Sequence, residues 1–141
     1  MRFWDSSSIV PLILTESMTG TLTTLIQPRG LMMVWWGTPV EVVSAVARRV
    51  REGALDAARF AQARRRLEIL SEGWQEVAPT DHLRELAERA VRVHELRAAD
   101  AFQLAAATVA AEGAPGAIEV VTLGRRLRDA ALRESFRVLP T

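Results

Sequence analysis

The sequence predicts an α/β fold in which a largely parallel sheet lies between two layers of helices. Short strand-like stretches alternate along the chain with longer stretches of helical periodicity. Strands separated by helices need crossover connections, which give parallel sheets that are covered on both faces. The chain has 141 residues, 49% of them hydrophobic, and no cysteine, so it can build one stable core without disulfides. We therefore expect a single domain over residues 1–141.

The first elements are a strand, a helix and a second strand. Arg2–Trp4 is expected to be a short strand, and the serines at 6–8 offer N-cap side chains for a helix over Ile9–Thr15. The apolar run LMMVWW at Leu31–Trp36 ends at Gly37. Such a continuous run is typical of a strand buried on both faces, so we interpret both of its tryptophans as core residues rather than as base-stacking platforms.

The middle of the chain predicts two helices and a short strand. A helix is expected from Thr38 to Val50, with proline at its first position and a glycine, Gly53, after its end. A second helix follows at Ala54–Leu70. Gln75–Ala78 is expected to be a strand, which the following proline stops.

The second half predicts three more helices and two strands. Thr80–His94 has the spacing of an amphipathic helix, whereas Arg97–Glu112 is alanine-rich and apolar, as expected for a buried helix. Ile118–Leu123 is a strand, Arg125–Arg133 is helical, and Phe136–Leu139 closes the chain as a strand.

Three acids stand where such a fold places ligands. Asp5 follows the first strand, Glu41 lies in the first turn of the helix after the second strand, and Asp100 lies near the start of the alanine-rich helix. Ligands of parallel sheets bind beyond the carboxyl ends of the strands, so the fold can bring these distant carboxylates to one edge.

Each acid also has a structural interpretation. Asp5 is a possible helix cap, Thr38-Pro39-Val40-Glu41 matches a capping box, and Asp100 suits the positive end of a helix dipole. A carboxylate on an apolar, buried helix nevertheless needs a partner, which for Asp100 is either Arg97 or a cation. Three clustered carboxylates repel one another unless a cation joins them, and oxygen ligands of this kind suit Mg²⁺ or Mn²⁺.

At these residues the sequence resembles the PIN-domain ribonucleases, and among them the VapC-type toxins of toxin–antitoxin systems. The resemblance covers nearly the whole chain through the stretches FWDSSSIV, TPVEVVSAV, LRAADAFQLAAA, VVTLGRRLRDAA and FRVLP. It implies a three-layer α/β/α fold with a five-stranded parallel sheet and a Mg²⁺- or Mn²⁺-dependent site that cleaves RNA. It also implies a homodimer and inhibition by a cognate antitoxin.

The resemblance assigns roles to individual residues. Asp5, Glu41 and Asp100 fall on the metal-binding acids, and Ser6 and Thr122 fall where small hydroxyl residues support the site. The family usually carries a further aspartate where this chain has a glycine, Gly124, and Asp129 lies too far along the following helix to replace it. This departure leaves an alternative open: a degenerate PIN domain that binds antitoxin or RNA without efficient cleavage.

All 18 basic residues are arginines, yet the formal net charge is only +1, so charge alone does not indicate a nucleic-acid-binding protein. Most of the arginine groups fit solvated helix faces. Arg125 and Arg126 are the best candidates for contact with the RNA backbone, because they lie beside the proposed site.

A flavodoxin-like or receiver-like regulatory domain also gathers acids at strand ends. A receiver usually adds a lysine, which this chain lacks. The longest apolar run is far shorter than the roughly 20 residues that span a bilayer, so we expect a cytoplasmic protein that does not enter the membrane.

Overall fold

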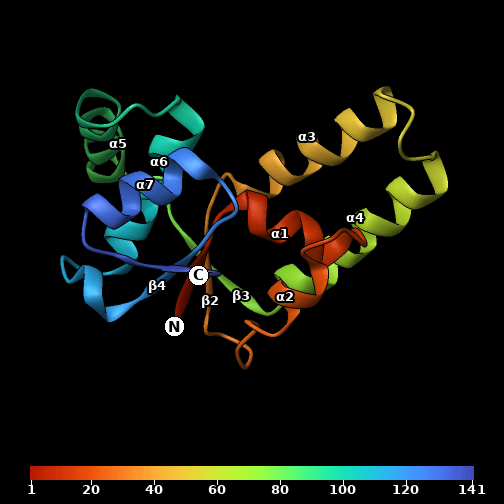
Figure 1. The fold of residues 1–141 in the computed structure, drawn as a ribbon, viewed down its shortest axis with the longest axis horizontal. Coiled ribbons are helices and arrows are strands. Elements are labelled where there is room, and N and C mark those ends of the chain that lie inside the picture. The colour runs from red at the N-terminus through yellow and green to blue at the C-terminus, as the bar shows by residue number, and fades with distance from the viewer.

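The computed structural model describes residues 1–141 and contains a five-stranded, all-parallel sheet between two layers of helices (Figure 1). This architecture confirms the predicted fold class. The strands are β1 (Arg2–Trp4), β2 (Met32–Trp35), β3 (Trp74–Val77), β4 (Glu119–Val121) and β5 (Arg137–Leu139). The helices are α1 (Ser6–Ile13), α2 (Thr19–Thr23), α3 (Thr38–Arg51), α4 (Ala57–Ser71), α5 (Asp81–Val93), α6 (Ala98–Ala110) and α7 (Arg125–Arg133), with a short 3₁₀ turn at Pro115–Ala117.

The order of strands across the sheet is β3-β2-β1-β4-β5. The chain moves outward from β1 through β2 to β3, and then returns to the other side of β1 to add β4 and β5. The direction of winding reverses at β1, so the crevice beyond its carboxyl end is the expected ligand site. A flavodoxin-like sheet has the order 2-1-3-4-5 instead, so the strand order excludes that alternative.

Two apolar cores lie on opposite faces of the sheet, because successive strand side chains point to opposite faces. Phe3 and Val120 pack on one face beneath α5, α6 and α7. Their neighbours Trp4 and Val121 pack on the other face against α1, α3 and α4. Figure 1 shows these two groups of helices on either side of the sheet, with α3 and α4 forming a hairpin whose tip projects away from it.

Helix starts are the least accurately predicted boundaries. The cap of α1 is Asp5 rather than a serine, since the Asp5 side chain accepts a hydrogen bond from the backbone N of Ser7. The start of α4 lies at Ala57 because Asp56 caps it through the backbone N of Arg59. Helix α2 is absent from the sequence-based prediction, as its threonines and glycine are weak helix formers.

The strand after residue 31 is shorter than predicted and is not buried to its end. Trp35 is 8% exposed, as expected of a core residue, but Trp36 lies beyond β2 and is 56% exposed. The interpretation of Trp36 as a core residue is therefore wrong. None of the helices is both long enough and apolar enough to cross a bilayer.

Candidate active site

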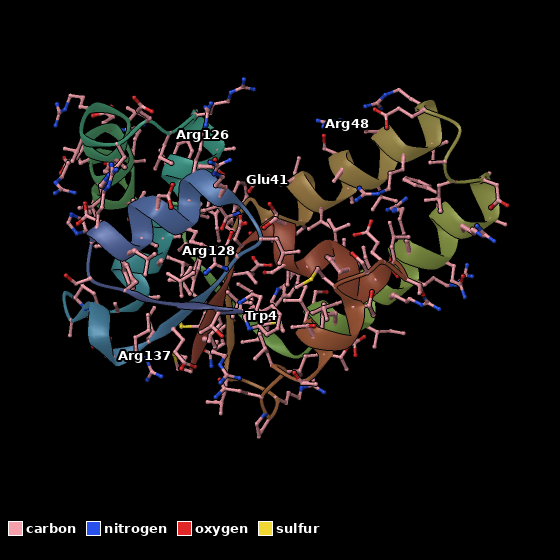
Figure 2. The ribbon with its side chains drawn as sticks, in the orientation of Figure 1. Trp4, Glu41, Arg48, Arg126, Arg128 and Arg137 are labelled. Carbon is pink, nitrogen blue, oxygen red and sulfur yellow. The ribbon has the colours of Figure 1, made fainter.

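The predicted acids lie at the carboxyl ends of the central strands. Asp5 directly follows β1, Glu41 is in the first turn of α3, which follows β2, and Asp100 is in the first turn of α6. Thr122 directly follows β4, the other neighbour of β1. Figure 2 shows Glu41 at the start of α3 and Arg126 on α7, at the same end of the molecule.

Asp5 is buried, with 3% of its surface exposed, and is held by hydroxyl donors from two elements. Its Oδ2 accepts hydrogen bonds from the Ser7 hydroxyl and from Thr122 Oγ1, the latter at 2.8 Å. Its Oδ1 accepts only a long bond of 3.4 Å from Ser6 Oγ. Asp5 thus caps α1 and stays a candidate site acid, and the hydroxyl groups of Ser6 and Thr122 both contact it.

Ser7 is a contact that the sequence-based prediction missed. Its hydroxyl bonds Asp5 and accepts from the backbone N of Leu123, at 3.0 Å, so it joins the end of β1 to the loop after β4. The signal in the sequence is an aspartate N-cap with a serine two residues later, where capping bonds fall.

Glu41 is held by a glutamine rather than by a capping box. The N-cap of α3 is Gly37, without a side-chain capping bond, so the capping-box interpretation is wrong. Gln103 Nε2 donates to Glu41 Oε2 at 2.7 Å and to Thr38 Oγ1 at 3.1 Å. Gln103 is fully buried on α6, three residues after Asp100 and therefore on the same helix face, a spacing that points to a shared site.

Asp100 is less buried than its apolar neighbours suggest. It is only partly covered, because α6 exposes its first residues, Ala98 and Ala99, and becomes buried from Ala101 onward. Arg97 forms no salt bridge with it; both Arg97 and Arg126 act on it only through their charge.

The three acids influence one another electrostatically. Burial raises the pKa of Glu41 from 4.5 to about 7, and the negative charges of Asp5 and Asp100 raise it further. Hydrogen bonds with Gln103 and Ser6 lower the pKa and offset part of this rise. Burial and the charge of Asp5 also raise the pKa of Asp100, against the lowering effect of Arg126 and Arg97. The site therefore concentrates negative charge that no bonded arginine neutralises.

The donor chemistry of this group fits a hard divalent cation. Both oxygens of Asp100 accept no hydrogen bond from the protein, and Asp5 Oδ1 accepts only the long one from Ser6. The side chains are not close enough together to form a coordination shell of three acids as they stand. They are nevertheless all oxygen donors at one sheet edge.

Solved structures with the same architecture include a toxin and a toxin–antitoxin complex. VapC20 from Mycobacterium tuberculosis, titled a sarcin-ricin loop cleaving toxin, aligns over 92% of this chain and 95% of its own, with a TM-score of 0.66 and 20% identity. FitAcB from Neisseria gonorrhoeae aligns over 99% and 97%, with a TM-score of 0.63 and 18% identity. A toxin–antitoxin complex from Klebsiella pneumoniae aligns over 88% and 87%, with a TM-score of 0.63 and 13% identity.

The chain has a PIN-like fold. No protein family and no curated protein matches it at the level of sequence. The structural likeness therefore carries the comparison.

Within the PIN-like fold, Gly124 faces the acidic site. It is the N-cap of α7 with extended backbone angles (φ −75°, ψ 119°), which residues other than glycine also adopt. A Cβ at this position would lie 3.3 Å from Thr122 Oγ1 and 3.9 Å from Asp5 Oδ2. A carboxylate here would therefore be directed toward Asp5.

The predicted RNA-binding arginines are both exposed at the start of α7. Arg126 also lines an open hollow of about 560 Å³ with Arg92 and Arg97, two residues that the sequence-based prediction did not select. Arg128 has a structural role instead, because its guanidinium donates to the backbone oxygens of Thr122 and Pro140.

The raised pKa of Glu41 predicts a pH-dependent stability in metal-free buffer. A carboxyl with a pKa of 4.5 unfolded and about 7 folded stabilises the fold fully below pH 4.5, and this contribution is lost as the pH rises to about 7. Between these values, the free energy of unfolding of the wild type should fall by about 1–2 kcal/mol relative to Glu41→Gln, allowing for solvent screening.

Urea unfolding in EDTA over a pH series measures this difference. Glu72→Gln, at an exposed position after α4, is the matched control and should follow the wild type. A difference between wild type and Glu41→Gln that stays constant over the range would contradict the proposed burial of the Glu41 charge.

Proposed function

We propose that this protein is a divalent-metal-dependent endoribonuclease and the toxin component of a toxin–antitoxin pair. The observation that carries the proposal is the group of carboxylates with free oxygens at the winding reversal of a PIN-like sheet. The similarity to VapC20, titled a sarcin-ricin loop cleaving toxin, supports a cleaving activity.

Asp5, Glu41 and Asp100 would hold Mg²⁺ or Mn²⁺ through their free oxygens. The bound cation would supply an activated water and stabilise the leaving oxygen of a phosphodiester. The protein's own part is to fix the acids: Ser7 and Thr122 immobilise Asp5, and Gln103 immobilises Glu41. The exposed guanidinium groups of Arg125 and Arg126 would contact phosphates of the RNA.

The antitoxin is proposed to bind along α4. A cavity of about 470 Å³ lies between the end of α1, α3 and α4, lined by apolar Ile13, Leu14 and Leu55 and by Arg59 and Arg66. Arg66 also borders a second hollow of about 320 Å³, which includes Leu12, Ile26 and the exposed Ile69. An apolar helix or extended segment fits such a groove. A homodimer, which the sequence resemblance implies, is proposed for the free protein.

Gly124 favours a second candidate function. The position that faces Asp5 carries no acid, so the site has less charge with which to hold a second cation. The alternative is a degenerate PIN-like domain that binds antitoxin or RNA and cleaves poorly.

Substitution of Asp100 tests the catalytic proposal. Mn²⁺ should raise the melting temperature of the wild type by mass action on the folded state. Asp100→Asn should abolish this increment and lower RNA cleavage by more than the roughly 10- to 100-fold typical of an outer-shell change. The apo variant should remain folded, because relief of repulsion offsets the lost charge.

Asp129→Asn, the same substitution at an exposed acid of α7, is the control and should keep both the metal response and the activity. Cleavage of generic RNA by Asp100→Asn at the wild-type rate would exclude the assigned site. A wild type that binds RNA and Mn²⁺ without cleaving would favour the degenerate alternative.

Restoring an acid at position 124 tests how many cations act. We expect one well-occupied cation in the wild type. Gly124→Asp should tighten metal binding and raise cleavage about tenfold at limiting Mg²⁺, with less effect at saturating Mn²⁺. Calorimetric titration and a cleavage series in Mg²⁺ provide the measurements.

Gly124→Asn separates charge from shape. Asparagine caps a helix as well as aspartate does, so it should reproduce any gain in stability but not the kinetic gain. Equal metal stoichiometry and equal cleavage rates for wild type and Gly124→Asp would show that Gly124 matters only for the backbone conformation at the start of α7.

The partner proposal is tested by charging the surface of α4. The protein should co-elute with the product of the neighbouring reading frame when the two are co-expressed. Ile69→Arg should disrupt co-elution, since Ile69 is 68% exposed beside the groove. Leu132→Arg is the control, because Leu132 is 53% exposed on α7, across the sheet. Equal co-elution of both variants would place the partner elsewhere.

A further inference from the structure

We propose that Trp36 is a stacking platform for a nucleobase of the RNA strand that enters the acidic site, an inference that rests on the proposed ribonuclease function. Trp36 is 56% exposed, in contrast to Trp4, Trp35 and Trp74, which are all buried. A large aromatic side chain exposed at the carboxyl edge of the sheet needs an explanation other than the core.

The ring of Trp36 is supported by two further aromatic rings. Trp35 meets it edge to face, with centroids 6.3 Å apart and an interplanar angle of 69°. Trp35 is stacked in turn on Phe102, with centroids 5.4 Å apart and planes within 3°. Gly37 allows this packing, because a Cβ there would lie 2.6 Å from Trp35 Nε1. The support of Trp36 is therefore a packed aromatic cluster rather than a mobile loop.

This aromatic cluster is joined to the elements that carry the acids. The backbone N of Trp36 bonds Val77 O, and the next residue, Gly37, accepts through its carbonyl from the backbone N of Glu41. Phe102 lies on α6, two residues after Asp100. Trp36 is thus fixed within about one helical turn of Glu41.

The strand order places Trp36 and the arginines on opposite sides of Asp5. Trp36 follows β2, Asp5 follows β1, and Arg126 follows β4, which are neighbours in the sheet in that order. Adjacent strands lie about 4.8 Å apart, so the span from β2 to β4 is about 10 Å.

Charge explains why a base, rather than a phosphate, suits the Trp36 side. The candidate phosphate contacts, Arg125 and Arg126, follow β4, and no arginine is bonded to Glu41 on the Trp36 side. Stacking needs no charge and accepts any base, because every base has a π face. Single-stranded RNA with splayed bases is bound in this way by exposed aromatic rings.

The test compares binding of a labelled single-stranded oligoribonucleotide with that of an abasic strand of the same length, in Ca²⁺ to slow cleavage. Trp36→Ala should weaken binding of the base-containing strand roughly 5- to 100-fold. Trp36→Phe should retain most of the affinity. All three proteins should bind the abasic strand alike, because stacking is then absent. In Mg²⁺, Trp36→Ala should raise KM more than it lowers kcat.

Val40→Ala is the matched control, because Val40 is 72% exposed one residue before Glu41 and offers no ring; its affinity should change less than about twofold. Equal binding of wild type and Trp36→Ala, with cleavage intact, would overturn the inference and leave the proposed function standing. A further outcome is that Trp36→Ala keeps its RNA affinity but changes the mass of the dimer or loses co-elution with the partner. That result would assign the Trp36 ring to a protein interface and would also overturn the inference. A wild type that neither binds nor cleaves RNA would overturn both proposals.

Discussion

The buried carboxylate of Asp5 is the contact on which the geometry of the candidate site depends. Its backbone N bonds Val121 O at 3.0 Å, while its Oδ2 accepts from the hydroxyl groups of Ser7 and Thr122. Thr122 Oγ1 also accepts from the backbone N of Gly124, at 3.0 Å. Since a buried carboxylate without donors is strongly destabilising, acid and donors require one another. The ends of β1 and β4 and the start of α7 are thereby held in one arrangement.

Glu41 and Asp100 have fewer hydrogen-bond donors than Asp5, which leaves carboxylate oxygens available to a cation. Asp5 is satisfied by hydroxyl donors, whereas burial outweighs the hydrogen bonds of Glu41 with Gln103 and Ser6 and raises its pKa to about 7. The charges of Asp5 and Asp100 also disfavour ionisation of Glu41. Two extensive apolar cores, one on each face of the sheet, stabilise the fold independently of this repulsion.

The fold class, the strand sequence and the positions of all three acids were predictable, because they depend on periodicity and on chain order. The choice of cap was not, since Asp5 was only one possible cap beside the serines at 6–8, and the Asp56 cap of α4 was not identified. Gln103 was missed because its partners, Glu41 and Thr38, are more than 60 residues away in sequence. Trp36 was misassigned because apolar continuity cannot show where a strand ends and its last ring turns outward.

Helix α1 links the acidic site to the groove proposed for the partner. It begins at the Asp5 cap, and its last residue, Ile13, lines the cavity beside α4 together with Leu14 and Glu16. Eight helical residues at 1.5 Å each separate these two ends by about 12 Å. A partner segment lying in the cavity therefore needs only about four extended residues to reach the carboxylates. Guanidinium groups border the groove and acids form the site, so a segment of mixed charge, acidic over the groove and basic at its end, complements both.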